Sequence, residues 1–378
     1  MTIKQKTKDF SFSTQKPLVE DQIPELIKSY RQEAWEIYQE LPFPTLKDEA
    51  WRRTSLRALD TGALELPQRV GSAAAENIPD ELRYPLPEDV AGGEALIGPG
   101  GVDIELDPEL EEEGVIFTDL LTAAREYPEL VEKVLGQVVP AQEGKFAALT
   151  AAYAANGLFI YVPRGLHVDK VLHSLTWAAE AGQAHLSQLL IYLEKGSSLT
   201  FVQESSSPVE SAGQSLLGEN VEIMVGKNAH LRMIELQTLG HEIWSFAHKR
   251  ALVEQDGSLD WVINALGSYL SKHFLSLDMT EKGAEGRVSG LFFADRDQHL
   301  SYNTQQNHLA PRTNSDLLFK GGLAGDSRSV WRGMIYVSPG AQYIDGYQAN
   351  RNLILSDQAR SDSIPGLEIM NNDVRCTH

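Results

Sequence analysis

Turns of similar composition recur through the second half of this 378-residue chain at nearly regular intervals. They lie at residues 194–197, 226–229, 255–258, 281–284 and 338–341. Their glycines are 30, 31, 26 and 57 residues apart, and the last interval is close to twice 28. A recurring period of this length in a β-rich segment indicates a solenoid, in which each repeat forms one coil.

The intervals between these turns contain short stretches in which apolar and polar residues alternate, as they do in β-strands. These stretches cover residues 158–162, 185–193, 198–203, 220–225, 230–237, 244–252, 259–265, 269–279 and 287–293. We therefore predict a mainly β protein with a right-handed parallel β-helix core over residues 158–378, with about eight coils and a length of roughly 40 Å. Because the period drifts, a β-sandwich or jelly roll remains the alternative architecture.

Residues 1–60 are predicted to form an N-terminal helical domain. Pro24 suits the first turn of a helix, and apolar residues follow it at helical spacing as far as Tyr38. Pro42 and Pro44 should end this helix, and a second short helix is predicted over residues 49–56.

Residues 61–157 are predicted to form an acidic mixed α/β segment that leads into the core. Residues 61–145 contain 19 acidic and 5 basic side chains, a net charge of −14 out of −20 for the whole chain. The Pro- and Gly-rich part up to residue 101 is expected to form loops with short strands. After it we expect a strand at 102–106, a helix capped by Thr118, a helix starting at Pro128, and a helix over 146–155 closed by Asn156 and Gly157.

Composition excludes several classes of protein. No apolar run reaches the roughly 18 residues of a membrane-spanning helix, and the polar N-terminus lacks the features of a signal peptide. A single cysteine rules out an internal disulfide framework and favours a reducing, cytoplasmic location. The excess of acidic residues without a basic stripe argues against a nucleic-acid partner.

Common catalytic motifs are absent from the sequence. There is no phosphate-binding loop ending in Gly-Lys-Ser/Thr, and His241-Glu242 lacks the second histidine of a zinc protease. His167 and His173 could share a strand face, although Lys170 between them makes a turn equally plausible. The motifs therefore point to no enzyme class.

Four aspartates keep one enzymatic alternative open, a β-helix lyase or hydrolase that acts on carbohydrates. They are Asp295, Asp297, Asp316 and Asp326. Glycosidic chemistry needs two carboxylates held at a set separation, and such an enzyme should have them in a long cleft lined with aromatic rings.

The end of the sequence contains the only cysteine, Cys376, with His378 two positions later. On a strand these two residues project from the same face, about 7 Å apart. A thiolate and an imidazole on one face can hold iron or zinc, but further ligands must then come from a partner chain. Cys376 and His378 are therefore the candidate metal or cluster ligands, and a buried structural cysteine is the alternative.

Four segments of the chain resemble the SufD branch of the SufB/SufD family, which belongs to the SufB–SufC–SufD scaffold of iron–sulfur cluster assembly. Residues 41–54 are similar to its Pro–Lys–Glu–Trp–Thr signature, and residues 156–165 to its entry into the β-helix. Residues 307–311, Asn-His-Leu-Ala-Pro, are similar to a third element. The most specific likeness is in residues 365–378, which contain Leu-Glu-Ile and then Asp-Val-Arg-Cys-Thr-His.

This resemblance implies a non-enzymatic scaffold subunit. It implies a heterodimer with SufB through the β-helix, docking of the SufC ATPase, and a nascent iron–sulfur cluster or iron at the SufB–SufD interface. Cys376 and His378 are then the cluster-site candidates. The isolated chain is expected to hold no cluster. It could form a homodimer. A third possibility is a purely structural partner that shapes SufB without touching the cluster.

The family pattern continues past the position of His378 through Gly-Ala-Thr into C-terminal helices that carry the SufC contact. These helices are missing from this sequence, so we expect a shortened chain whose SufC contact is in doubt. SufB relatives usually carry further cysteines in the core, whereas this chain has none before Cys376.

Overall fold

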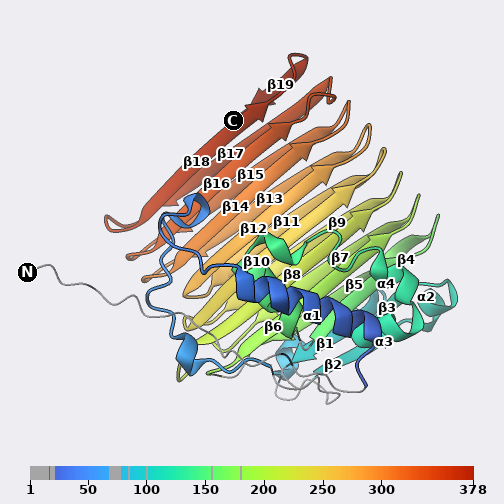
Figure 1. The fold of residues 1–378 in the computed structure, drawn as a ribbon, viewed down its shortest axis with the longest axis horizontal. Helices are drawn as coiled ribbons and strands as arrows, with labels where there is room; N and C mark the ends of the chain where they lie inside the picture. Colours follow the sequence, from blue (N-terminus) through green and yellow to red (C-terminus); the bar gives the residue numbers. More distant parts are fainter. Residues whose placement is uncertain are drawn as a thin grey trace, which may run out of the picture.

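The computed structural model describes residue 17 and residues 22–67, 78–83, 86–98, 101–154, 156–178 and 181–378. Within these ranges the chain coils about 8 times into a parallel β-solenoid, and its strands lie side by side in one long stack (Figure 1). The predicted mainly β, coiled architecture is confirmed. The sandwich and jelly-roll alternatives are wrong, because strands of successive coils pair in parallel.

Each coil contributes one strand to each of two sheets. The first sheet contains β1 (Ala91–Gly98), β2 (Gly101–Leu106), β5 (His167–Trp177), β7 (Ser198–Ser206), β9 (His230–Leu239), β11 (Ser258–Gly267), β13 (Glu285–Ala294), β15 (Asn314–Leu323), β17 (Ile344–Ile354) and β19 (Val374–Thr377). The second contains β3 (Ile116–Asp119), β4 (Asn156–Val162), β6 (Ala184–Leu193), β8 (Ser215–Val225), β10 (Ile243–Val253), β12 (Leu270–Met279), β14 (His299–His308), β16 (Arg328–Val337) and β18 (Arg360–Ile369). Only the pairs β1–β2 and β3–β4 are antiparallel among the pairs of named strands.

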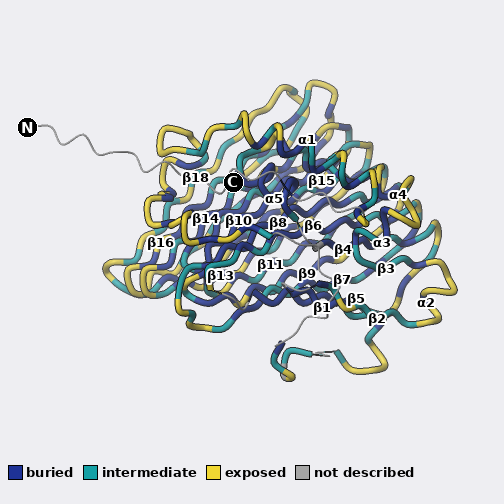
Figure 2. The backbone as a smooth tube through the Cα atoms, turned by 60° about the horizontal axis from the view of Figure 1, so that its bottom comes forward, coloured by how far each residue is buried: buried dark blue, intermediate teal, exposed yellow. Residues whose placement is uncertain are grey.

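Inward-facing side chains stack in columns from coil to coil, because the strands pair in register. One column runs through Phe201, Met233 and Trp261, all of them fully buried. Burying an apolar side chain of this size contributes roughly 1.5–3 kcal/mol. Figure 2 shows the result, with buried backbone along the strands and exposed backbone at the turns between them. The core is therefore a continuous apolar filling of the solenoid.

All helices of the described ranges precede β4, and none is long and apolar enough to cross a bilayer. The α-helices are α1 (Glu25–Glu40), α2 (Pro108–Glu112), α3 (Leu120–Glu126), α4 (Pro128–Glu132) and α5 (Lys145–Tyr153). Single 3-10 turns are η1 (Glu49–Trp51), η2 (Thr61–Ala63), η3 (Asp80–Leu82) and η4 (Ala141–Glu143). The predicted N-terminal helical region is thus present.

Helix α5 joins this helical layer to the second sheet. Phe146 of α5 stacks on Phe246 of β10, with ring centroids 3.8 Å apart, and Trp51 stacks on Phe146 at 5.7 Å. Lys145 donates hydrogen bonds to the carbonyls of Tyr38 and Leu41 at the end of α1, where a positive charge is favourable. Helix α1 therefore lies against the outer surface of the solenoid through α5 (Figure 1).

Glu222 attaches the segment after α4 to the solenoid. Its carboxylate accepts hydrogen bonds from the backbone N–H groups of Gly136, Val138 and Val139, at 2.9, 3.0 and 2.9 Å. The side chain is fully buried, and burial raises its pKa to about 7. One buried carboxyl group thus satisfies three backbone donors that no secondary structure pairs.

Several local predictions are wrong in detail. The cap of α3 is Asp119, whose carboxylate accepts from Leu121 and Thr122, while Thr118 lies in β3. The short helix predicted after Pro44 is only the 3-10 turn η1. Asn156 opens β4 rather than closing α5, which ends at Tyr153.

Strand β1 lies in the segment up to residue 101, for which loops with short strands were predicted, and it contains Gly92 and Gly93. These glycines allow close packing, since a Cβ on Gly93 would lie 2.9 Å from the carbonyl oxygen of Glu105 in the neighbouring strand. Strand β5 passes through both His167 and His173, with a register irregularity between His167 and Val171. A glycine pair therefore signals close approach of strands here, and not a turn.

Candidate functional site at the terminal coil

The two predicted site residues lie at the end of the solenoid farthest from β1 and β2 (Figure 1). Cys376 belongs to β19, which pairs with β17 so that Cys376 lies opposite Gly346. Val374 and Cys376 pack against the buried cluster of Ile335 and Ile344, whereas the side chains between and after them are exposed. Residues 374–377 therefore form a strand, as the predicted pair of Cys376 and His378 requires. The thiol of Cys376 faces the interior of the solenoid.

His378 follows the last residue of β19, and its side chain is exposed. Among the described residues there is no group of three or more His, Cys, Asp or Glu side chains arranged to hold a metal ion. The joint role of Cys376 and His378 in a metal or cluster site thus stays a prediction. That a partner chain supplies further ligands stays a prediction as well.

The residues that occupy the same register position as Cys376 in successive coils are no longer apolar near the end of the solenoid. Gly346 and Ser315 precede Cys376 in register, 30 and 61 positions earlier in the sequence. A Cβ on Gly346 would lie 3.1 Å from Nε2 of His308 and 3.4 Å from a methyl group of Ile335. Because glycine has no side chain, the imidazole of His308 reaches the backbone one strand spacing below Cys376.

A directed chain of hydrogen bonds sets the tautomer of His308. The amide nitrogen of Gln306 donates to Ser315 Oγ at 2.6 Å, so the Ser315 hydroxyl donates onward to His308 Nε2 at 2.9 Å. On the other side Thr313 Oγ1 donates to the carbonyl of Ala310, so it accepts from His308 Nδ1 at 2.7 Å. His308 therefore carries its proton on Nδ1 and presents the Nε2 lone pair toward the column under Cys376.

Burial governs the ionisation of both groups. It lowers the pKa of His308 to about 4, so the imidazole is neutral at neutral pH. Burial, together with the Asp345 carboxylate, raises the pKa of the Cys376 thiol. A metal ion that binds this thiol must therefore displace its proton.

Farther down the interior, one lysine joins two buried glutamates. Lys249 lies 2.5 Å from Glu235 and 2.9 Å from Glu219, and Trp261 Nε1 donates to Glu235 at 2.7 Å. Burial alone would lower the pKa of Lys249, but the two carboxylates raise it above its usual value. The lysine is therefore a charged bridge between the two sheets.

The terminal coil also exposes apolar side chains. Leu367 and Ile369 of β18 continue inward-facing columns and are 38% and 40% exposed, whereas the preceding members Ile335 and Val337 are fully buried. Further exposed apolar residues of this coil are Leu353, Ile354, Leu355 and Met370. We call Leu367, Ile369 and these four residues the terminal apolar surface. Such a surface on a protein marks a site of contact with another element or chain.

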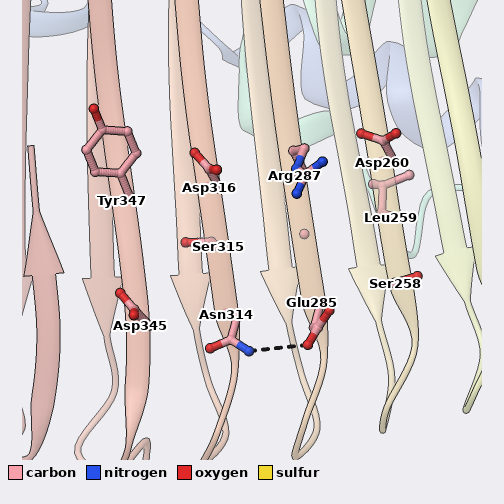
Figure 3. Close-up of a pocket in the computed structure, with 11 residues that line it drawn as sticks. Ser258, Leu259, Asp260, Glu285, Arg287, Asn314, Ser315, Asp316, Asp345 and Tyr347 are labelled. Atoms are coloured by element: carbon pink, nitrogen blue, oxygen red, sulfur yellow. Dashed lines mark hydrogen bonds between the residues drawn. The ribbon is translucent and has the colours of Figure 1, made fainter.

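An open groove of about 610 Å³ lies along β11, β13, β15 and β17 (Figure 3). Its charged side chains stack from coil to coil, with Arg287 in register between Asp260 and Asp316. Asn314 donates to Glu285 of the adjacent strand at 3.3 Å, as the dashed line in the figure marks. These contacts are cross-strand pairs of a solvent-facing sheet.

The four aspartates weighed for carbohydrate chemistry do not all come together. Asp295 and Asp297 lie in the turn after β13, and Asp326 lies in the neighbouring turn after β15. Asp316 is near the start of β15, at the opposite end of that strand. Asp316 is thus separated from the other three by the length of its strand.

Comparison with known families completes the description of this coil. Residues 176–378 match the family model described as "SUF system FeS cluster assembly, SufBD core domain", and residues 104–173 match the "SufBD protein N-terminal region". The first match alone covers more than half of the chain. The chain belongs to the SufBD family.

Curated relatives agree with this assignment. They include iron–sulfur cluster assembly SufBD family proteins of Staphylococcus haemolyticus, Staphylococcus epidermidis and Staphylococcus aureus. Each is 28% identical over 364 residues, which cover 94% of this chain and 77% of the relative. The SufBD core match includes the whole terminal coil with Cys376 and His378.

Sequence reasoning missed Gly346, which pairs with Cys376 in this SufBD chain, and the polar residues around Ser315 one coil further down. His308 was noted only as part of a segment that resembles the family, while Gln306, Ser315 and Gly346 were not singled out. A signal was present, since Ser315, Gly346 and Cys376 are spaced by 31 and 30 residues, the same intervals as the first turn glycines. Residues one period apart stack in a solenoid, so this spacing predicts a shared column.

Proposed function

We propose that this SufBD chain is a non-catalytic SufD-type scaffold subunit of iron–sulfur cluster assembly. It would pair with SufB through the terminal coil, and the nascent cluster, which is cargo and not a resident cofactor, would form at their interface. The observation that carries this proposal is the coincidence, on one coil, of the terminal apolar surface and the chain's only cysteine.

The strand edges of this coil suit such a partner. Among the described strands, β18 pairs only with β16 and β19 pairs only with β17, so each presents an edge that another strand can extend. Added strands would also cover Leu367 and Ile369. The interface would thereby close the interior above Cys376.

A coupling to the SufC ATPase fits the same geometry. We propose that SufC docks on this subunit and on SufB, and that nucleotide-driven closure moves one solenoid against the other. Register-paired strands packed on a continuous core form a stiff body, which transmits displacement to the interface. The movement would open or rearrange the site that contains Cys376.

The first experiment tests the docking surface. The paired change Leu367→Asp with Ile369→Asp places two charges on the terminal apolar surface and should weaken binding to SufB at least tenfold, or about 1.4 kcal/mol. Co-purification and calorimetric titration with SufB measure the effect. The matched control is Val209→Asp, which changes a 66% exposed apolar residue in the turn before β8 and should leave binding unchanged. Equal binding by all three proteins would contradict the proposed interface, and a homodimer lost in the paired variant would indicate self-association through this coil.

The second experiment tests the cluster role. Cys376→Ala and His378→Ala should leave thermal unfolding within about 0.5 kcal/mol of the parent, because both positions are partly or fully exposed. Each should lower the yield of iron–sulfur cluster in the complex with SufB and SufC. Anaerobic reconstitution with iron and sulfide, followed by absorbance, measures that yield. Full cluster formation in both variants would leave only the structural-partner role.

A further inference from the structure

A long loop leaves the helical layer, reaches the last coils of the solenoid and returns to the first ones. We call residues 41–66 the strap. It begins where Lys145 of α5 donates to the carbonyl of Leu41 at 2.7 Å, and near its end Glu65 forms a parallel bridge with Gln183, just before β6. Between these points the blue trace after α1 follows the second sheet toward β16 and back (Figure 1). The strap therefore spans several coils, whereas a coil of a solenoid by itself contacts only its neighbours.

Trp51 anchors the middle of the strap on the second sheet. It is 8% exposed, and its ring centroid lies 6.2 Å from that of Phe246 in β10 and 6.0 Å from that of Phe274 in β12. Beside it, Nζ of the buried Lys272 donates to the carbonyl of Ala50 at 2.6 Å. Separating these two groups would leave a buried polar atom short of a partner. The strap is therefore docked on the sheet by apolar packing and by a directed hydrogen bond.

The tip of the strap contacts the last three strands of the second sheet, β14, β16 and β18. Each strand contributes one contact: His299 Nε2 with Thr54 Oγ1 at 3.1 Å, Arg332 with Glu49 at 2.8 Å, and Asp362 with Arg53 at 3.5 Å. The two ion pairs are partly exposed, so each contributes little by itself. They become effective because Trp51 already holds the strap in place. The helical layer thus contacts the terminal coil directly, through the strap.

We propose that the strap holds β18 in the paired geometry that a partner strand needs, so that docking of the strap and docking of SufB stabilise each other. Among the described strands β18 pairs only with β16, and a strand paired on one side opens more readily than one inside a sheet. Contacts of the strap with Arg332 and Asp362 fix both strands from their outer face. Coupling between two docking events is reciprocal, so bound SufB should in turn protect the strap.

This inference rests on the proposed scaffold function and extends it, because it gives the helical layer a part in partner binding. The layer lies against early coils through α5, while the proposed partner surface lies on the last coil. The strap bridges this separation without any change in the core. Its effect on β18 can be measured in the chain alone, and its effect on SufB binding can be measured separately.

The first arm of the test follows hydrogen exchange of β18 in the full chain without a partner. Trp51→Ala should speed exchange of the β18 amides at least tenfold, and Glu49→Ala with Arg53→Ala should speed it about threefold. The matched control is Glu25→Ala with Lys28→Ala, which removes an ion pair of 3.9 Å from α1 and should leave β18 unchanged. Amides of β9 in the first sheet should exchange at the parental rate in every variant, which excludes a general loss of stability.

The second arm titrates the same variants with SufB. Binding should weaken at least tenfold in Trp51→Ala and about threefold in the paired variant, and bound SufB should slow exchange of residues 45–57 in the parent. Unchanged exchange of β18, or unchanged SufB affinity despite faster exchange, would overturn the inference. If Trp51→Ala does not fold, the paired variant decides. If the parent does not bind SufB, the proposed function fails, while exchange of β18 still decides whether the strap holds this strand.

Discussion

Replacing Lys249 with methionine is expected to lower the free energy of unfolding by about 3–5 kcal/mol. The ammonium group lies 2.5 Å from Glu235 and 2.9 Å from Glu219, and all three side chains are buried. Methionine keeps most of the length and apolar surface of lysine, so the change mainly removes charge. Two carboxylates then remain together in a low-dielectric interior without their counter-charge. Urea denaturation at neutral pH measures the loss.

Two further variants make this prediction specific. Lys195→Met changes an exposed turn lysine and should shift stability by no more than about 0.5 kcal/mol. Adding Glu219→Gln and Glu235→Gln to Lys249→Met removes the orphaned charges and should recover most of the loss. A loss below about 1 kcal/mol in the single variant would mean that the lysine does not hold these charges in the folded protein.

Replacing Glu222 with alanine is expected to lower the free energy of unfolding by about 3–5 kcal/mol at pH 5. The change leaves the N–H groups of Gly136, Val138 and Val139 without an acceptor, at the point where the segment after α4 attaches to β8. Thermal or urea denaturation measures the loss. Hydrogen exchange should show faster exchange at these three amides first.

The effect of Glu222 should depend on pH with a defined sign. Its pKa is raised from 4.5 in the unfolded chain to about 7 in the folded protein. The folded state therefore binds the proton more tightly, and the contribution of Glu222 is fully present below pH 4.5 and is lost as the pH rises through 7. The difference between the parent and Glu222→Ala should shrink by up to about 3 kcal/mol from pH 4.5 to pH 8. The exposed Glu210→Ala is the control, and a difference that grows with pH would contradict the assignment.

The coiled architecture was predictable because its signals are local and repeated. Each turn glycine and each alternating stretch reports on one coil, and the error at one repeat is averaged over the others. Predictions that depended on a single residue were less accurate. Thr118 was predicted to cap the helix, for example, whereas Asp119 caps it in the structure.

The candidate site shows the same contrast between what local sequence predicts and what distant contacts decide. Cys376 was identifiable as the single cysteine, and its place on a strand was predicted, whereas the direction of its side chain came from the fold. The residue that pairs with Cys376 was not identifiable by adjacency, because Gly346 is 30 positions away in the sequence. Sequence proximity favoured His378, which the fold leaves exposed.

The amino-acid sequence by itself determined that this chain coils, which part of it is helical, and which residue supplies its only thiol. These properties follow from turn spacing, side-chain periodicity and composition, which do not depend on distant contacts. Only the tertiary structure decided which residue lies opposite Cys376 and which glutamates surround Lys249. Those contacts depend on the register of paired strands, and a drifting period of 26 to 31 residues does not specify that register in advance.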